Sequence, residues 1–276
     1  MLPKYNRGRW ALATAMLTIA LAAGPARAAS GDLLVAPTRL VLDGARGSEV
    51  VLNNIGAEPA TYRVSLELRR MTKDGKLIDV TEPNAAEKAA LDMIAYAPRR
   101  VTLQPNQPQA IRVGVRLPEA LADGEYRVHM LFRAIPDAKP AAPAQITRID
   151  GVAIALTPIY GVTIPVIVRA GALDAKAGIA NARIVDQGGK QAISFDISRT
   201  GTRSVFGEVR VTKPGAGDPV IVARGVAVYP EVDSRTVTLP VTSGFTGSLA
   251  GPATIRYVER AEDGGRVLAE ADVVLR

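Results

Sequence analysis

The stretch GVAIALTPIYGVTIPVIVR, residues 151–169, alternates in hydrophobicity with a period of two residues. Every even-numbered position from Val152 to Val168 holds Val, Ile, Leu, Pro or Tyr, whereas the odd-numbered positions are on average smaller and more polar. Such alternation predicts a β-strand with one apolar face. Because most strands have about 3–10 residues, we expect this long segment to bend, to break or to serve two sheets.

The same period of two continues on both sides of this stretch. Upstream, TYRVSLELRR at residues 61–70 and GEYRVHMLFRAI at residues 124–135 alternate in the same way. Downstream, short alternating segments separated by turns recur up to a last strand at residues 267–275. Strands at this spacing indicate antiparallel β-sandwiches. We therefore predict an all-β fold with two β-sandwich domains, at residues 29–169 and 170–276.

Three stretches depart from the strand pattern. The segment at residues 84–95 is the one good helical window, because Asn84 can cap a helix and Glu87 follows three residues later. We expect a short helix or a turn there. KDGK at residues 73–76 predicts a hairpin turn. Residues 137–149, rich in Pro and Ala, predict an exposed loop.

Composition excludes several kinds of site. The 276 residues include no Cys and one His, which excludes disulfides, thiol nucleophiles, iron–sulfur clusters and metal sites with several Cys or His ligands. The single histidine, His129, stands in a strand-like segment with no nucleophile motif, so we predict a structural role for it. We expect no catalytic residue, no cofactor and no bound metal.

Residues 1–28 predict a cleaved secretory signal peptide. A basic start precedes an apolar stretch at residues 10–23, and Ala26-Arg27-Ala28 matches the Ala-x-Ala cleavage pattern. The apolar stretch is shorter than the roughly 20 residues of a spanning helix, so we expect no membrane insertion; an N-terminal anchor is the alternative. Removing these residues takes away four basic and no acidic side chains, which lowers the formal net charge from +7 to +3. We therefore expect a periplasmic protein that does not bind nucleic acid.

One arginine stands in the middle of an apolar segment, LLVAPTRLVLD, at residues 33–43. If Arg39 points inward, its charge needs a carboxylate from the protein or from a ligand, because an unpaired buried guanidinium is costly. If it points outward, it is an ordinary residue of an edge strand. The sequence also leaves two roles for the apolar face of residues 152–168. This face either fills the protein's own core or is covered by a partner's strand.

Three segments in order carry a family resemblance. TRLVLDG at residues 38–44 is similar to a first strand of the form T-R-(hydrophobic)₃-D-G, and residues 123–136 resemble a D-R-E-S…I-P stretch. Residues 97–105, followed by Ile111-Arg112-Val113, resemble a P-P…R-L-x-P-G…R segment. The chain thereby resembles the periplasmic chaperones of the chaperone–usher pathway over about residues 33–171. The resemblance implies two immunoglobulin-like β-sandwich domains in an L-shaped or boomerang arrangement.

The resemblance also implies a function without an enzymatic step. A chaperone of this family binds incomplete pilus or fimbrial subunits by donor-strand complementation and delivers them to an outer-membrane usher; an idle chaperone can cap itself as a dimer. Arg39 falls on the arginine that anchors the subunit's terminal carboxylate, with Thr38 and Arg112 as further candidates. The donor strand would comprise Ile154, Leu156, Tyr160, Val162 and Ile164. The interdomain ion cluster would comprise Glu125, Arg169 and either Asp263 or Glu262.

One part of the family pattern is missing. The second anchor of the family is a lysine late in the donor strand, but here Thr163, Ile164 and Pro165 occupy that region. The sequence leaves open whether Arg39 acts alone, whether another arginine such as Arg112 substitutes, or whether the client is not a typical pilin. Pro165 lacks a backbone donor and is expected to bend or end the pairing.

Two other functions stay open. An immunoglobulin-like structural or adhesion protein of the periplasm could bind a partner without completing its fold, and it predicts that the even face of residues 152–168 is wholly buried. A secreted β-sandwich enzyme acting on carbohydrate predicts a cleft with paired carboxylates. The single Trp and four Phe argue against sugar stacking in such a cleft.

Overall fold

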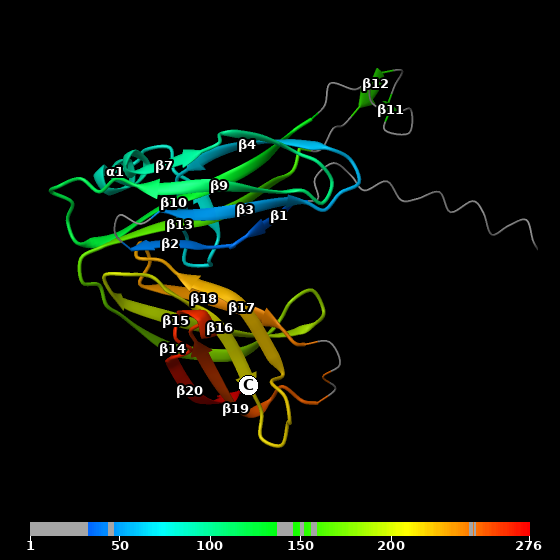
Figure 1. The fold of residues 1–276 in the computed structure, drawn as a ribbon. Coiled ribbons are helices and arrows are strands. Elements are labelled where there is room, and N and C mark those ends of the chain that lie inside the picture. The colour runs from blue at the N-terminus through cyan, green and yellow to red at the C-terminus, as the bar shows by residue number, and fades with distance from the viewer. Residues whose placement is uncertain are drawn as a thin grey trace, which may run out of the picture.

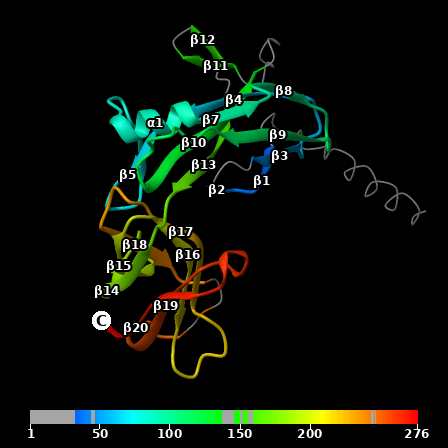
Figure 2. The same ribbon diagram turned by 60° about the vertical axis from the view of Figure 1, so that its left-hand side comes forward.

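The computed structural model describes residues 33–43, 47–136, 159–242, 245 and 247–276, together with the backbone of residues 146–149 and 152–155. Figure 1 shows two β-sandwiches that are linked at one side and diverge from there, and Figure 2 shows the same bent arrangement from a second direction. This confirms the predicted all-β, two-sandwich fold. The predicted signal peptide lies outside the described residues. In the described part, no helix is long and apolar enough to cross a membrane.

Two sheets form the first sandwich. One has the order β1-β3-β9-β7 and the other β2-β13-β10-β4-β8, and within them only β2 and β13 pair in parallel. Tyr62, Leu52, Met130 and Phe132 are among the large side chains fully buried between the sheets. The strands are β1 (Leu33–Ala36), β2 (Leu40–Asp43), β3 (Ser48–Asn54), β4 (Ala60–Glu67), β7 (Ile94–Ala97), β8 (Arg100–Leu103), β9 (Pro108–Val115), β10 (Gly124–Ile135) and β13 (Gly161–Ala170).

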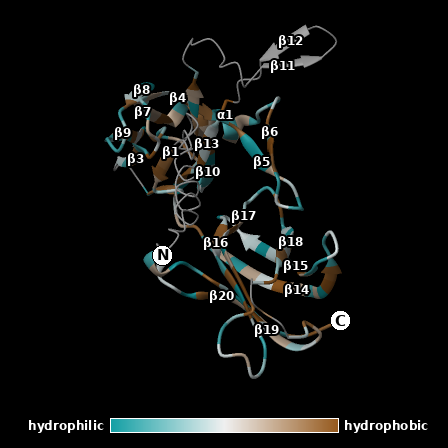
Figure 3. Cartoon of the chain, turned by 90° about the vertical axis from the view of Figure 1, so that its right-hand side faces the viewer, coloured by the Kyte–Doolittle hydropathy of each residue, from teal (hydrophilic) through white to brown (hydrophobic). Residues whose placement is uncertain are grey.

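The second sandwich also has two sheets. Their orders are β14-β15-β18 and β17-β16-β19-β20, and hydrophobic residues recur between polar ones along these strands (Figure 3). Phe195, Ile193 and Tyr257 are fully buried between them. The elements are β14 (Ala175–Asp186), β15 (Gln191–Gly201), β16 (Val205–Thr212), β17 (Ile221–Val228), β18 (Ser234–Pro240), β19 (Gly251–Val258), the short helix η2 (Ala261–Asp263) and β20 (Val267–Leu275).

The long alternating segment breaks, as the sequence predicts. Its first part, β12 (Val152–Ala155), pairs with β11 (Ile146–Ile149) in a separate hairpin, and its last part is β13. The predicted loop at residues 137–149 therefore ends in a short strand. Pro165 does not end the pairing with β10, because β13 continues through it opposite His129. Pro165 is tolerated because β2 joins the other side of β13 only from Val166 onward.

The predicted helix and hairpin are both present. Helix α1 (Ala85–Met93) begins with a capping box in which Asn84 accepts from the Glu87 amide and Glu87 accepts from the Asn84 amide. Strands β5 (Arg69–Met71) and β6 (Leu77–Asp79) flank the predicted turn. The Glu87 carboxylate also receives two 2.6 Å hydrogen bonds from Arg70, which holds α1 against β5.

The sole histidine is buried in β10. His129 is 1 % exposed, and neither ring nitrogen has a hydrogen-bond partner among the described residues. Burial, assisted by the charges of Arg127 and Arg69, lowers the pKa of His129 to about 3. The ring is therefore neutral near pH 7, which supports the structural role predicted for it.

The His129→Gln variant should be less sensitive to mild acid than the parent protein. Because the pKa of His129 is lowered in the folded state, the imidazole is protonated in the unfolded chain but stays neutral in the folded one at mildly acidic pH. The free energy of unfolding therefore falls as the pH drops below about 6.5. Between pH 7.5 and pH 5 this difference amounts to about 2 kcal/mol. Urea unfolding of both proteins at the two pH values measures it, and equal losses would show that His129 does not contribute.

Candidate functional site

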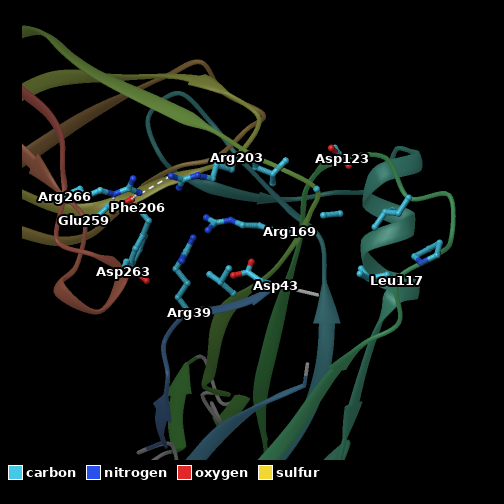
Figure 4. A pocket seen from close by; sticks show the side chains of 16 residues that line it. Arg39, Asp43, Leu117, Asp123, Arg169, Arg203, Phe206, Glu259, Asp263 and Arg266 are labelled. Atoms are coloured by element: carbon cyan, nitrogen blue, oxygen red, sulfur yellow. Dashed lines mark hydrogen bonds and ion pairs between the residues drawn. The ribbon is translucent and has the colours of Figure 1, made fainter. Parts of the chain in front are cut away.

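A cleft of about 890 Å³ lies between the two sandwiches. Figure 4 shows side chains from both sandwiches pointing into it. The first sandwich contributes Arg39, Val41, Asp43, Leu117, Pro118, Leu121, Asp123, Arg169, Ala170 and Gly171, and the following segment Leu173. The second contributes Arg203, Phe206, Glu259, Asp263 and Arg266. Four of these residues are arginines and four are acidic (Asp43, Asp123, Glu259 and Asp263), so the lining is rich in charges of both signs.

Strand alternation in β2 aims Arg39 at the cleft. Leu40 and Leu42 belong to the core of the first sandwich, whereas Val41, on the opposite face, packs against the core of the second. Arg39 precedes β2 and shares the face of Val41. The guanidinium is therefore inward, 7 % exposed, but it lies between the sandwiches and not inside either core. Of the two orientations that the sequence leaves open, this is the buried one.

Arg39 is short of partners. Its guanidinium lies 4.6 Å from the ring centroid of Phe206, in cation–π geometry. Neither Nε nor Nη2 has a hydrogen-bond partner among the described residues. Burial lowers the pKa of Arg39, and the nearby charge of Arg169 lowers it further. An anion entering the cleft would relieve both penalties, because it would accept hydrogen bonds and compensate the charge.

A buried carboxylate joins the two sandwiches beside Arg39. The Glu125 side chain is fully buried, and its Oε2 lies 3.2 Å from Arg169 Nε, its cross-strand neighbour in β13. The same oxygen accepts hydrogen bonds from the Ser204 amide at 3.1 Å and the Ser204 hydroxyl at 2.8 Å. Ser204 precedes β16, so one carboxylate ties β10 and β13 to the second sandwich.

The structure brings two members of the predicted ion cluster together and leaves the third apart from them. Glu125 and Arg169 meet, but Asp263 pairs with Arg260 at 3.0 Å. Ser204 takes the place expected for Asp263 at the Glu125 carboxylate. A hydroxyl at the start of a strand carries no sequence signal for this contact, because the contact depends on how the two sandwiches dock.

A second inter-sandwich contact lies on the neighbouring side of β10. The Glu231 carboxylate accepts hydrogen bonds from Arg127 at 2.5 Å and 3.2 Å and from the Met71 amide at 2.7 Å. Arg127 also lies 3.6 Å from the ring centroid of Tyr229. The apolar core of the second sandwich includes Met71 and Ile167 from the first. These contacts fix the angle at which the cleft opens.

The anchor candidates other than Arg39 lie elsewhere. Arg112 is on β9, in the opposite sheet, where its side chain is 86 % exposed and 3.5 Å from Glu49. It does not line the cleft, so the structure does not bring it to Arg39. Thr38 is exposed and is also absent from the cleft lining.

The predicted donor residues divide along the chain. Ile164 is buried in the core of the first sandwich, Val162 packs partly against it, and Tyr160 is 50 % exposed. Ile154 belongs to β12, and Leu156 lies outside the described residues. Ile164 cannot lend its side chain to a partner while its own core is intact. The accessible apolar positions therefore lie at and before Val162.

Half of β13 has one free edge. The whole strand pairs with β10 on one side, from Gly161 to Ala170. On the other side β2 pairs only with residues 166–169. Residues 161–165 thus have no strand on that side among the described residues, which leaves backbone groups free to pair with an added strand.

Comparison with known proteins gives likenesses in structure only. No family model matches the chain, and no curated protein matches its sequence. Similar solved structures are the E. coli chaperone DraB (14 % identity, 88 % of this chain and 96 % of that one, TM-score 0.46) and the SafB chaperone in complex with the Salmonella enterica SafA pilin (16 %, 89 % and 97 %, TM-score 0.45). The Pseudomonas aeruginosa CupB2 chaperone is another (13 %, 88 % and 100 %, TM-score 0.45).

Removing the Glu125 charge should loosen the junction. In Glu125→Gln the buried pairing with Arg169 and Ser204 is weakened, and we expect a loss of about 1–3 kcal/mol in the free energy of unfolding. The matched control is Glu270→Gln, which breaks the exposed pair with Arg256 and should cost about 1 kcal/mol or less. Urea unfolding compares the two variants, and small-angle scattering detects a wider range of inter-sandwich angles. Equal behaviour of both variants would refute the role given to Glu125.

Proposed function

We propose that this chain is a periplasmic chaperone that holds incomplete pilus or fimbrial subunits by donor-strand complementation. One observation carries the proposal: Arg39, buried and with unpartnered nitrogens, stands where the free edge of β13 meets the cleft. The motifs at residues 38–44, 97–105 and 123–136 support the same function through their resemblance to the family. Periplasmic export by the predicted signal peptide and delivery to an outer-membrane usher belong to this proposal.

The direction of β2 explains how Arg39 would act. Strand β2 runs parallel to β13 and begins at Leu40, opposite Val166. A partner strand paired in parallel with residues 161–165 would lie in line with β2 and end just before it. Its terminal carboxylate would then arrive at Arg39. The guanidinium fork suits this group, because it can donate two parallel hydrogen bonds to a carboxylate.

Side chains before Ile164 would complete the partner's fold. Tyr160 and Val162 continue the even-numbered face of β13 toward its first residues, where Val162 packs only partly against its own core and Tyr160 is half exposed. Each apolar side chain that a partner buries contributes about 1.5–3 kcal/mol. A few such side chains together with backbone pairing can hold a subunit that lacks one strand. Ile154 and Leu156 remain predicted members of this set.

The alternative is an immunoglobulin-like structural or adhesion protein that binds a partner without completing its fold. It requires the even face of the segment to be buried within its own domain. The half-exposed side chain of Tyr160 does not fit that requirement. The chaperone therefore accounts for more of the observations.

The Arg39→Gln variant should lose client capture and keep its fold. Glutamine removes a buried charge that has few partners, so the unfolding midpoint should not fall, whereas loss of a charged hydrogen-bonding group costs about 1.5–3 kcal/mol of binding, or roughly 10- to 100-fold. The measurement is recovery of subunits with the tagged protein from periplasmic extracts, identified by mass spectrometry. Arg112→Gln, which removes an exposed arginine of the same sandwich, is the control. Undiminished capture by Arg39→Gln would contradict the anchor.

A charge at Val162 should show whether this side chain binds a partner or is buried in its own domain. Val162→Asp places a carboxylate at the predicted donor edge, where the parent side chain is only partly buried. We expect subunit capture to fall at least tenfold while the unfolding midpoint shifts little. Val274→Asp, at a 59 % exposed position of β20, controls for added charge. Equal loss of capture and stability in Val162→Asp would favour the self-buried alternative.

A further inference from the structure

We infer that the carboxylate site is shared by both sandwiches: Arg203 of the second sandwich, together with Arg169, supplies the cation that complements Arg39. The inference rests on the proposed chaperone function and deepens it, because it assigns the second half of the anchor to a residue outside the donor strand. It also makes Arg266 a positioning residue that keeps Arg203 free to bind.

Three arginines from three parts of the chain line the same cleft. Arg39 comes from the residue before β2, Arg169 from β13 and Arg203 from the segment before β16. Figure 4 shows Arg39 and Arg169 pointing into the same space, and Arg203 lying across it toward Glu259. Like charges at short range repel, and the lowered pKa of Arg39 has the charge of Arg169 among its causes. An anion bound among the three guanidinium groups would attract each of them and so offset their mutual repulsion.

Arg169 keeps donors available for such an anion. It is bonded to Glu125 through Nε alone, and its two Nη groups have no hydrogen-bond partner among the described residues. Glu125 Oε2 also accepts hydrogen bonds from the amide and the hydroxyl of Ser204. The Glu125 contact therefore fixes where Arg169 points without using the fork of its guanidinium.

Arg203 is only weakly paired, because Arg266 binds the nearest carboxylate, that of Glu259. Glu259 is 7 % exposed and receives two hydrogen bonds from Arg266, at 2.9 Å and 3.0 Å. Arg203 Nη2 lies at 3.9 Å from the same carboxylate, and its one side-chain hydrogen bond is a 3.4 Å contact to the Ser204 carbonyl. The bidentate pair with Arg266 thus leaves Arg203 weakly engaged.

Nearby acids compensate these arginines only in part, because the charges of Glu125 and Asp263 raise the pKa of Arg39 but burial and the charge of Arg169 lower it by more. Asp263 is paired with Arg260 at 3.0 Å. Asp43 and Asp123 line the cleft but form no ion pair with any described residue. A single carboxylate, carried by the end of a partner strand on the free edge of β13, fits the space between Arg39, Arg169 and Arg203 in sign and in direction of approach.

Two peptides test the site without a known client. Both contain ten residues of alternating valine and threonine after two lysines, and one ends in a free carboxylate while the other ends in an amide. The ratio of their dissociation constants, measured by calorimetry at low salt, isolates recognition of the terminal charge. For the parent protein we expect the free acid to bind about tenfold tighter, equivalent to about 1.4 kcal/mol.

Four variants and one control locate that recognition. Arg203→Gln should reduce the ratio to about threefold, and Arg39→Gln to about one. Arg266→Gln should act like Arg203→Gln, because Glu259 is then released to pair with Arg203. Arg203→Lys should restore part of the ratio. Arg256→Gln removes an arginine of the same sandwich that is paired with Glu270 outside the cleft, so it should leave the ratio unchanged; unfolding midpoints confirm that each variant is folded.

The outcomes separate this inference from the proposed function. A ratio in Arg203→Gln equal to that in Arg256→Gln overturns the shared site, even if Arg39→Gln abolishes recognition. A ratio near one in the parent protein also overturns it. Subunit capture by the parent protein in either case would leave the chaperone function standing. A tenfold ratio that depends on Arg203, in a protein that captures no subunit, would support the site and reject the chaperone.

Discussion

The geometry of the cleft depends on one buried charge, the carboxylate of Glu125. A buried carboxylate is costly unless it is paired and hydrogen-bonded. Glu125 finds its partners through Oε2, in Arg169 and in the amide and hydroxyl of Ser204, whereas Oε1 has no hydrogen-bond partner among the described residues. Because the partners come from both sandwiches, the charge stabilises the docking in which they meet. Because Arg203 directly precedes Ser204 in the chain, the contact that fixes the angle also brings Arg203 to the cleft.

Strand β13 serves three structural purposes along one backbone. Its even-numbered side chains from Ile164 onward fill the first core, and Ile167, on the opposite face, is fully buried in the core of the second sandwich. Its first half leaves one edge unpaired, next to the entry of β2. A strand anchored by two cores at one end can offer its other end to a partner at little cost in stability, because the residues exposed there contribute little to either core.

Local sequence signals predicted what local physics decides. Alternation identified the strands and the break in the long segment, and the spacing of Asn84 and Glu87 identified the capped helix α1. Contacts between the sandwiches were harder to predict from the sequence, because they depend on how the sandwiches dock and not on periodicity. Asp263 and Arg112 were therefore misassigned, and Ser204 was missed. Arg203 carried no signal either, because an arginine in a turn before a strand is normally solvated.

The stacking of Arg39 on Phe206 makes the anchor sensitive to the position of the second sandwich. Phe206 lies on β16 and also has Arg260 at 5.0 Å from its ring centroid. The ring offsets part of the cost of burying Arg39, because cation–π attraction strengthens when the cation is desolvated. Arg39 is thus oriented by a residue of the sandwich that does not carry it. Any displacement of the second sandwich would release the guanidinium, so the angle set at Glu125 and the readiness of Arg39 to bind an anion are one linked property.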